Sequence, residues 1–360
     1  MTVGRVQTIA VPAEGFPRIA VIRLSSLGDV VLTLPVVHAL ARRFPSARIT
    51  YWVKEEYGDV VRFDPAIHHV RRLERDARRI EDLVSMSAEL EEADLIVDLH
   101  GNPRTRVLTF RQKAPLLRVR SHRLARAALV HARWLRRPPP PPALGRYAAA
   151  LAPIGIVPEG PPRMSVGPEA ERRAEVWLGT WAPPRQPLAL LPGARHFTKR
   201  WPEERWIELH DRLIATGWPL LYASLESERA GFPRLAERVS AAPAARWCTE
   251  PLAIMAALLA RCAAAVTMDS GLMHVAAARG LPVVALFGST APELGFAPAG
   301  DGHRVLCRHE PCQPCTLHGR ASCPKGHFRC MLGITAEQVG VALDGIVSAP
   351  ALEDRTSAPL

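Results

Sequence analysis

Short apolar runs alternate along the first half of the chain with segments of helical periodicity. The runs at residues 18–24, 48–53 and 93–99 are typical of buried strands, and residues 30–43 have the length and spacing of a helix. Strand, helix and strand in this order favour parallel βαβ units. We therefore predict an α/β domain with a parallel sheet in the first half.

The same alternation returns downstream, so we expect a second α/β domain. Its predicted strands are residues 188–191, 219–223, 264–268 and 282–287. Its predicted helices are residues 206–216, 229–239, 252–262, 272–279 and 336–347.

Proline-rich segments separate the two series. Pro138–Pro142 are five consecutive prolines, and residues 153–168 are rich in Pro and Gly. Proline fixes φ and lacks an N–H donor, so neither segment belongs in a central strand or a helix interior. We expect a surface loop at the polyproline, an N-terminal domain of residues 1–165, a C-terminal domain of residues 166–348, and a flexible tail at 349–360.

Hydrophobic residues make up 48% of the 360 residues and charged residues 22%, which excludes a disordered chain and indicates a globular one. The sequence contains neither an apolar run of about 18 residues nor the basic-then-apolar order of a signal peptide. We therefore expect a cytoplasmic protein.

The net charge of +11 is unevenly distributed. Residues 101–137 contain eleven Lys or Arg and no Asp or Glu. Such a stretch attracts an anionic partner, which could be a nucleic acid, an acidic lipid surface or an acidic substrate. A solvated basic face accounts for it equally well.

Asp29 lies in a turn between a predicted strand and a predicted helix, in the sequence Ser-Ser-Leu-Gly-Asp at residues 25–29. That turn places the carboxylate at the carboxyl end of a parallel strand, where ligands bind in open α/β sheets. A carboxylate there could act as a base. Capping of the following helix is the competing interpretation, because Asp often fills that position.

A loop after residues 188–191 combines a glycine turn at Gly193 with cationic side chains that include Lys199. A flexible ammonium beside a glycine turn suits a phosphate. Ordinary surface charge is the alternative.

Asp269, Ser270 and Gly271 form a tight turn between a predicted strand and a helix of small residues. Free backbone N–H groups at such a helix start bind anions. Asp269 and Ser270 could instead be simple caps, and His274 a buried core histidine.

Glu226 and Glu228 follow the second predicted strand of the C-terminal domain. An acidic residue at that place in a Rossmann unit commonly binds ribose hydroxyls. Stabilisation of a helix N-terminus by acidic residues is the alternative.

These motifs together closely resemble those of the lipopolysaccharide heptosyltransferases of glycosyltransferase family 9, which add ADP-activated heptose to the inner core. The resemblance rests on residues 25–29, on the Pro-Gly-Ala loop with Lys-Arg-Trp-Pro at 199–202, and on Asp-Ser-Gly-Leu-Met-His at 269–274, and it extends from residue 18 to about 347. It implies the GT-B fold, with two Rossmann-like domains facing a central cleft. It also implies inversion at the anomeric carbon without a catalytic metal.

The resemblance assigns Asp29 as the general base and Lys199 as the lysine that binds the diphosphate. The nucleotide sugar, ADP-heptose, is expected in the C-terminal domain, at Gly193, Thr198, Glu226, Glu228, Asp269, Ser270, Gly271 and His274. The acidic inner-core acceptor is expected in the N-terminal domain, at Ser26, Gly28, Asn102, Arg118, Arg120 and Arg123. An acceptor of this kind implies peripheral association with the cytoplasmic face of the inner membrane.

Five of the seven cysteines lie between Cys307 and Cys330. The thiolates of Cys312, Cys315, Cys323 and Cys330 could form a structural zinc site. Unmetallated thiols or an iron–sulfur cluster are the alternatives, because the spacing is not that of a standard zinc finger. Some members of the family resembled here have such clusters and others lack them, so we expect no cofactor to be required for catalysis.

Two other functions remain open at this stage. A nucleic-acid-binding protein with a structural metal site would account for the basic stretch and the cysteines, although it leaves the motifs at Asp29, Lys199 and Asp269 unexplained. A transferase of the same family with another donor or acceptor, acting in surface-polysaccharide assembly, would fit the same motifs.

Overall fold

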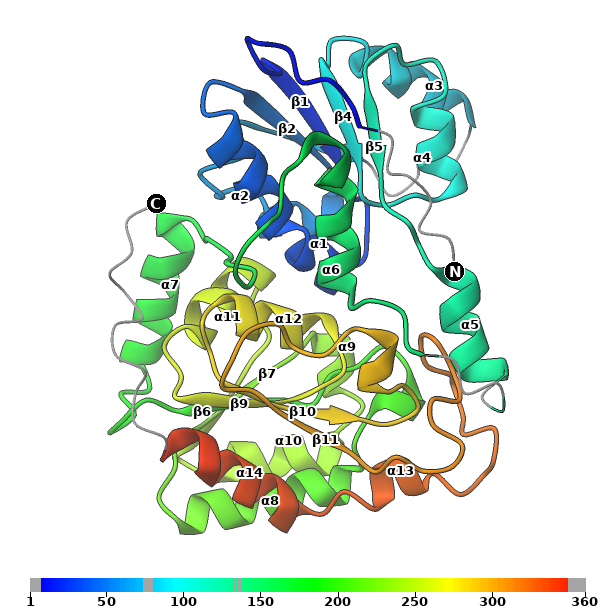
Figure 1. Cartoon of the computed structure of the whole chain (residues 1–360). Helices are drawn as coiled ribbons and strands as arrows, with labels where there is room; N and C mark the ends of the chain where they lie inside the picture. The colour runs from blue at the N-terminus through cyan, green and yellow to red at the C-terminus, as the bar shows by residue number, and fades with distance from the viewer. Residues whose placement is uncertain (1–7, 74–79, 133, 135–137, 349–360) are drawn as a thin grey trace. The chain divides into compact units, whose positions relative to one another are not determined.

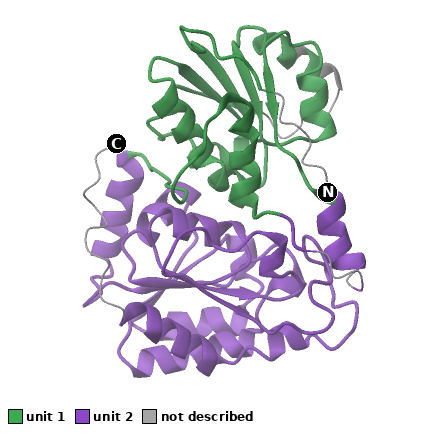
Figure 2. Cartoon of the chain, in the orientation of Figure 1, with its two compact units in different colours: residues 1–123, 141–167 green, residues 124–140, 168–360 purple. Residues whose placement is uncertain are grey.

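A computed structural model describes residues 8–73, 80–132, 134 and 138–348 (Figure 1). The chain divides into two compact units (Figure 2). Unit 1 consists of Met1–Arg123 and Pro141–Gly167, and unit 2 of Leu124–Pro140 and Pro168–Leu360. The predicted tail at 349–360 lies outside the described residues.

The last crossing between the units, at Gly167–Pro168, lies two residues after the boundary expected from the sequence. Residues 124–140 differ from the expectation, because they group with unit 2 and not with the first domain. One physical reason is that the helix α5 (Arg123–His131) contacts unit 2, where the Arg126 guanidinium lies 6.0 Å from the ring centroid of Phe296.

Unit 1 is built on a five-stranded parallel sheet in the order β3-β2-β1-β4-β5. Its strands are β1 (Arg18–Ile22), β2 (Arg48–Lys54), β3 (His69–Leu73), β4 (Leu95–Asp98) and β5 (Leu116–Arg118). On one side α1 (Leu27–Leu32), α2 (Leu34–Arg43) and α6 (Ala143–Ala148) pack together, and on the other α3 (Ile80–Glu89) packs on α4 (Pro103–Leu108). The short 3-10 helices η1 (Glu55–Val60) and η3 (Ala149–Ile154) complete the unit.

The single helix predicted at residues 30–43 is two helices that meet at Thr33. Pro35 stands in the first turn of α2, where its missing N–H costs nothing, whereas it would break a continuous helix. The break makes α1 a short helix that begins directly after the turn at Ser26.

Unit 2 is built on a six-stranded parallel sheet in the order β11-β10-β9-β6-β7-β8. Its strands are β6 (Leu188–Leu191), β7 (Leu220–Ala223), β8 (Ala245–Cys248), β9 (Ala264–Met268), β10 (Val283–Phe287) and β11 (Arg304–Cys307). Three predicted segments, 188–191, 264–268 and 336–347, are confirmed with the same bounds as β6, β9 and α14 (Ala336–Val347).

Helices cover both faces of this sheet (Figure 1). One layer contains α8 (Glu203–Ala215), α10 (Pro233–Ala241) and α14, and the other α7 (Pro168–Gly179), α11 (Leu252–Leu259) and α12 (Gly271–Ala278). Short elements connect them: η4 (Phe197–Lys199), α9 (Glu226–Arg229), η5 (Pro292–Leu294) and α13 (Arg329–Leu332).

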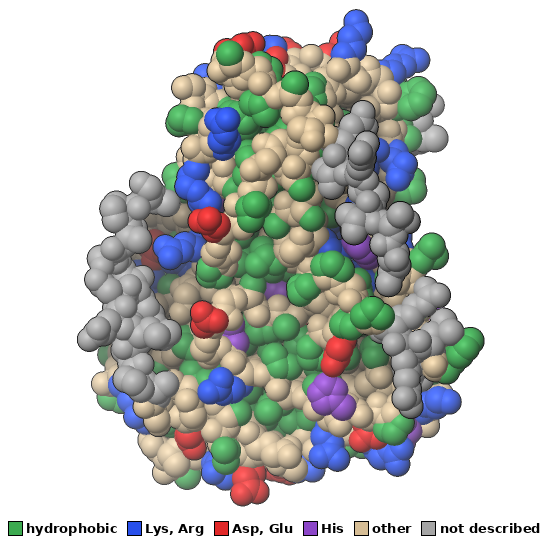
Figure 3. All heavy atoms as spheres, viewed as in Figure 1, with side chains coloured by type: hydrophobic (Ala, Val, Ile, Leu, Met, Phe, Trp, Pro, Cys, Tyr) green, Lys and Arg blue, Asp and Glu red, His purple; other side chains and the backbone are tan. Residues whose placement is uncertain are grey.

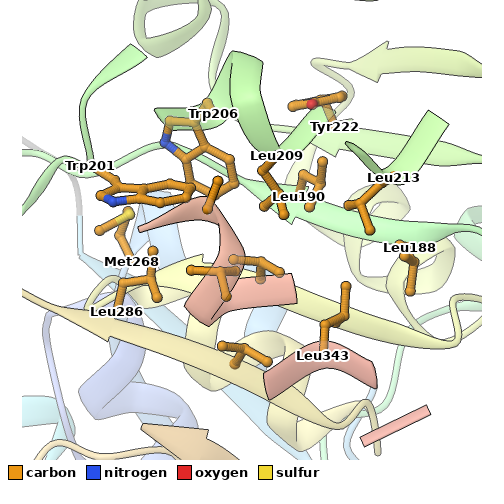
Figure 4. Close-up of a cluster of buried hydrophobic side chains, with 14 of the residues drawn as sticks. Leu188, Leu190, Trp201, Trp206, Leu209, Leu213, Tyr222, Met268, Leu286 and Leu343 are labelled. Atoms are coloured by element: carbon orange, nitrogen blue, oxygen red, sulfur yellow. The ribbon is translucent and has the colours of Figure 1, made fainter. Parts of the chain in front are cut away.

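The core of unit 2 fixes the loop that follows β6 (Figure 4). Trp201 and Trp206 are buried edge to face, with ring centroids 5.1 Å apart, among leucines of the sheet and of α14. The indole N–H of Trp201 donates to the carbonyl of Ile334 at 3.0 Å. Trp201 therefore anchors the chain two residues after Lys199.

Both sheets have their topological switch point at their first strand. Numbered within unit 2, the strand order is 3-2-1-4-5-6, and unit 1 has the same order without a sixth strand. In such sheets, ligands bind at the carboxyl ends of strands 1 and 4, where the connections leave in opposite directions. These strands are β1 and β4 in unit 1, and β6 and β9 in unit 2.

Candidate active site

Asp29 lies after β1, with both carboxylate oxygens hydrogen-bonded. The Tyr147 hydroxyl donates to Oδ1 at 2.5 Å. Oδ2 accepts from the Ser26 hydroxyl at 2.8 Å and from the Ser26 backbone N–H at 3.3 Å, and the Arg23 guanidinium lies 2.9 Å from it. The Ser26 contacts are those of a helix cap, so the carboxylate caps α1 and also faces Arg23 and Tyr147.

These contacts determine the charge of Asp29. Burial alone would raise the pKa of this carboxyl, but the Arg23 guanidinium and the hydrogen bonds from Tyr147 and Ser26 outweigh it and lower the pKa to about 2. Asp29 is therefore ionised at neutral pH. The sequence analysis identified neither Arg23 nor Tyr147. Arg23 could have been recognised as a charge that ends an apolar run, but no sequence pattern links Tyr147 to Asp29, which lies 118 positions away.

His100 follows β4 and belongs to the same group of side chains. Burial, followed by repulsion from Arg23, lowers the pKa of its imidazole to about 4, so the ring is neutral at neutral pH. Its Nδ1 atom is buried without a hydrogen-bond partner in the described part of the chain. Asp29, Arg23 and Lys54 all influence its charge, which places a neutral imidazole among charged groups at this strand end.

Of the residues expected to bind the acceptor, several make other contacts. Arg118 pairs with the buried Asp98 at 2.8 Å and donates to Thr109 at 2.6 Å, and Asn102 caps α4 by accepting from the Thr105 N–H at 2.9 Å. These side chains stabilise the loops after β4 and β5. Ser26 binds Asp29, Gly28 is buried in α1, and Arg120 and Arg123 are exposed.

The basic stretch at 101–137 does not form one surface of one domain. In unit 1, Arg104, Arg106, Arg111, Lys113 and Arg120 are exposed, whereas Arg126 belongs to unit 2. Three of its arginines lie outside the described residues, at 133, 136 and 137. In the view of Figure 3, Lys and Arg side chains are scattered among acidic and apolar ones.

In unit 2, Lys199 and Asp269 meet at the switch point. The Lys199 ammonium lies 2.7 Å from Oδ2 of Asp269, and the Thr290 hydroxyl donates to the same oxygen at 2.6 Å. Both members of the ion pair are largely buried, with side chains 15% and 9% exposed. The loop after β6 thus brings a cation to the carboxyl end of β9 and joins two motifs that the sequence analysis treated separately.

Next to Asp269, α12 begins at Gly271 with Ser270 as its extended N-cap residue. The Ser270 hydroxyl makes no capping hydrogen bond, and its buried oxygen has no partner in the described residues. The first N–H groups of a helix have no partner within it and carry the positive end of the dipole. The Ser270 hydroxyl and the start of α12 together suit an anion. His274, which lies further along α12, is buried.

Thr198 has a different position from the one expected of a donor-binding residue. It is 1% exposed, and its hydroxyl oxygen accepts from the Ser289 hydroxyl and from the Arg320 backbone N–H, each at 2.8 Å. Its backbone N–H donates to the Arg320 carbonyl at 3.1 Å. Thr198 therefore fastens the Lys199 turn to the cysteine-rich segment.

The two glutamates predicted to bind ribose also differ from each other. Glu228 accepts from the Leu225 N–H at 3.2 Å, in the manner of a helix cap, and its carboxylate packs against Gly193 so closely that a Cβ on this glycine would lie 2.3 Å from Oε2. Glu226 is exposed and lies 3.6 Å from Arg229. Glu226 is thus the freer of the two.

The cysteine-rich segment packs on the loops that follow β6 and β10. Cys315 donates its backbone N–H to the Ser289 carbonyl at 3.0 Å, and Cys312 Sγ lies 3.6 Å from Nε2 of His327. Within the described ranges, no group of three or more His, Cys, Asp or Glu side chains is arranged to hold a metal ion. The four thiols as placed do not fit a zinc centre, and the zinc site stays a prediction from the sequence.

Comparisons with known proteins agree on one class. Residues 85–324 match the family model described as glycosyltransferase family 9 (heptosyltransferase). Lipopolysaccharide heptosyltransferase 1 of Pseudomonas aeruginosa is 32% identical over 320 residues, which cover 83% of this chain and 86% of that protein.

Two solved structures share the fold. One is a family 9 glycosyltransferase from Veillonella parvula, with a TM-score of 0.76, 22% identity, and coverage of 92% of this chain and 97% of that one. The other is the ADP-heptose lipopolysaccharide heptosyltransferase II of Escherichia coli, with a TM-score of 0.70, 20% identity, and coverage of 92% and 98%.

The two Rossmann-like units, each with polar residues at its switch point, form the GT-B fold that these structures share. The chain belongs to glycosyltransferase family 9, the heptosyltransferase family. None of the helices in the described part of the chain combines the length and the apolarity that a membrane crossing requires.

Proposed function

We propose that this enzyme transfers heptose from ADP-heptose to the inner core of lipopolysaccharide, with inversion at the anomeric carbon. The names of the Pseudomonas and Escherichia relatives support the donor and the acceptor. The observation that carries the proposal is the pair of Lys199 and Asp269 beside the start of α12, at the switch point of unit 2. This arrangement suits a nucleoside diphosphate.

Negative charge grows on the diphosphate as the bond to the sugar breaks. An ammonium and aligned helix N–H groups therefore stabilise the transition state more than the bound substrate. In this proposal Lys199 and the first turn of α12 supply the positive charge that stabilises the diphosphate. Asp269 holds the ammonium in place, with Thr290 as a further hydrogen-bond donor.

Asp29 acts as the general base. Its carboxylate is ionised, lies at the switch point of unit 1, and is 16% exposed. As the acceptor oxygen attacks the anomeric carbon on the face opposite the diphosphate, the hydroxyl proton passes to the carboxylate.

The acceptor is a glycolipid, so we place the enzyme on the cytoplasmic face of the inner membrane, where it associates peripherally. The exposed cations of the basic stretch support this placement, because each Lys or Arg near an anionic surface adds about 1 kcal/mol of attraction. Transfer itself requires no cofactor, since Lys199 and α12 provide the positive charge that a metal would otherwise supply.

The zinc hypothesis for the cysteine-rich segment is a separate matter from transfer. Metal analysis of the protein purified without chelator decides it: one zinc per chain, lost in Cys312→Ser, is the expected result for a structural site. Iron with visible absorption would favour the cluster alternative, and no metal would leave unmetallated thiols.

The test of function is an assay with a panel of nucleotide sugars and a deacylated inner-core acceptor, with the product mass as readout. With ADP-heptose as the donor, we expect the product mass to exceed that of the acceptor by one heptose. NMR should show the anomeric configuration opposite to that of the donor. Another sugar as the best donor would favour the same-family alternative in surface-polysaccharide assembly.

Asp29→Asn keeps the shape of the side chain and removes the base. We predict a fall in kcat of roughly 100-fold or more, with ADP affinity unchanged, since a general base contributes on that scale. Tight ADP binding measured by calorimetry is the control for folding. Near-normal turnover in this variant would refute the assignment of the base.

A further inference from the structure

We propose that Arg23 and Tyr147 are positioning residues that leave one lone pair of Asp29 free, on Oδ1, and that this lone pair receives the acceptor proton. The inference rests on the proposed role of Asp29 as the base. It goes further, because it names the accepting atom and the two side chains that select it.

The hydrogen bonds that Asp29 already makes identify which of its oxygens can accept the proton. A carboxylate offers about two lone-pair sites on each oxygen. Three donors surround Oδ2: the Ser26 hydroxyl at 2.8 Å, the Ser26 N–H at 3.3 Å and the Arg23 guanidinium at 2.9 Å. Oδ2 is therefore saturated. Among the described residues, Tyr147 alone donates to Oδ1, at 2.5 Å, so one lone pair of Oδ1 remains for an incoming hydroxyl.

Arg23 and Tyr147 are themselves fixed. A second guanidinium nitrogen of Arg23 donates to the Leu99 carbonyl at 2.7 Å, and the guanidinium lies 5.1 Å from the centroid of the Tyr147 ring. The Arg23 side chain is 11% exposed, and Tyr147 is 4% exposed on α6, which packs against α1. The base is thus held by β1 on one side and by α6 on the other.

The step balances as a single displacement. The acceptor oxygen forms its bond to the anomeric carbon while the electron pair of the old carbon–oxygen bond leaves with the diphosphate. The acceptor O–H bond breaks and its proton forms a bond to Oδ1. Tyr147 keeps its own proton, because burial and the neighbouring Asp29 charge raise the pKa of its hydroxyl far above neutrality.

The same two residues determine where Asp29 titrates. Other groups that face this cluster are Tyr51 and Lys54 from β2, Arg146 on α6 and His100 after β4. Arg23 also lowers the pKa of His100, so each pH profile is recorded again in the His100→Asn background, where a remaining difference between variants reports on Asp29. Without Arg23, burial is no longer offset, and the pKa of the Asp29 carboxyl rises towards and above its ordinary value of 3.8.

The experiment compares the pH dependence of kcat/KM from pH 4.5 to 9 in Arg23→Gln, Tyr147→Phe and the natural enzyme. Because the pKa of Asp29 is about 2, the natural enzyme should show no acid limb from this residue in that range, whereas an acid limb should appear in Arg23→Gln. In Tyr147→Phe, kcat should fall about tenfold while the acceptor KM changes little, because orientation is lost and not affinity. Arg23→Lys should remove most of the acid limb by restoring the cation.

Matched controls in unit 2 are Arg279→Gln, which also removes a mostly buried guanidinium paired with a glutamate, and Tyr222→Phe, which also removes a buried hydroxyl. Their pH profiles should superimpose on that of the natural enzyme. An unchanged kcat in Tyr147→Phe would overturn the inference even if Arg23→Gln failed to fold, and so would a folded Arg23→Gln whose pH profile matches that of the natural enzyme. Near-normal turnover of Asp29→Asn would instead remove the base assignment, so the two failures are distinguishable.

Discussion

Three aspartates lie at or after the carboxyl ends of central strands in this protein, and their neighbours give them different roles. Asp29 and Asp269 each meet a cation in a partly open site, whereas Asp98 is fully buried, accepts from the N–H groups of His100 and Gly101, and pairs with Arg118. Spacing predicted a carboxylate at the switch point but not its partners, because Arg23 and Tyr147 reach Asp29 only through the tertiary fold. Periodicity left two interpretations of Asp29, a helix cap and a general base. Only the resemblance to a family favoured the general base.

Lys199→Ala tests the leaving-group site. The variant removes the ammonium and leaves the mostly buried Asp269 carboxylate unpaired, where it repels a diphosphate. We predict that kcat falls about 100-fold and that ADP binding weakens by at least tenfold, on the scale of a lost electrostatic contact in the transition state. Lys199→Arg, which keeps the charge, should lie in between. Unchanged ADP affinity by calorimetry together with intact turnover would place the donor elsewhere.

His100 predicts a pH dependence of stability in unit 1. Its folded-state pKa of about 4 lies below the ordinary 6.5, so its stabilising contribution is complete above pH 6.5 and is lost as the pH falls towards 4. The shift corresponds to about 3 kcal/mol at most. Asp29 does not contribute in this window, because its own loss occurs between pH 3.8 and about 2.

We therefore expect the urea midpoint of unit 1 to fall between pH 7 and 4.5 in the natural protein and to fall less in His100→Asn. His69→Asn, at an exposed position on the edge strand β3 of the same unit, is the control and should follow the natural protein. Parallel midpoints in His100→Asn and the natural protein would contradict the prediction.

At the scale of elements, the sequence indicated the seven central strands and missed all four edge strands, β3, β5, β8 and β11. Central parallel strands are buried on both faces and therefore appear as continuous apolar runs, as in β9. Edge strands are short and half exposed, so β3 (HVRRL) and β11 (RVLC) carry cations that hide the pattern. The candidate site was still predictable, because both switch points involve central strands.

The link between η4 and the cysteine-rich segment carries a prediction of its own. Thr198→Val keeps the volume but removes the oxygen that accepts from Ser289 and Arg320, and leaves both donors unpaired at a buried position. An unpaired buried donor costs about 1–3 kcal/mol. We expect the Lys199 turn to loosen and ADP affinity to fall about tenfold, measured by calorimetry.

Thr216→Val is the matched control, because its hydroxyl bonds only within the end of α8 and the residue is exposed. It should leave ADP affinity unchanged. If Thr198→Val lowered the melting temperature without weakening ADP binding, the link would serve stability alone.

At the scale of the whole molecule, the two α/β halves could be predicted from the alternation of strands and helices, because each half repeats the same winding. The grouping of residues 124–140 could not, since α5 is connected in sequence to unit 1 but contacts unit 2. The same crossing divides the basic stretch between the units. The cations of this stretch therefore do not all belong to one domain.

Exposed cations follow β4 and β5, two strands of the same parallel sheet as β1, after which Asp29 lies. Arg104 and Arg106 lie on α4, which starts shortly after β4, and Arg120 follows β5. All three belong to unit 1 and extend from the carboxyl edge of its sheet, where Asp29 lies after β1. Arg118 is a poorer candidate than the sequence suggested, because it is already paired with Asp98. We therefore predict that Arg104, Arg106 and Arg120 contribute to recognition of the acidic acceptor.

Reversing these three charges to Glu should raise the acceptor KM by tenfold or more at low salt, with the ADP-heptose KM unchanged. Each cation near an anionic partner adds about 1 kcal/mol, and screening shortens from about 10 Å at 0.1 M salt to 3 Å at 1 M, so the effect should shrink as salt rises. The control reverses Arg42, Arg43 and Arg48, which are also exposed but lie at the end of α2 and the amino end of β2. This control changes the net charge by the same amount. An equal rise of the acceptor KM in both triple variants would mean that acceptor binding depends on overall charge and not on this edge of the sheet.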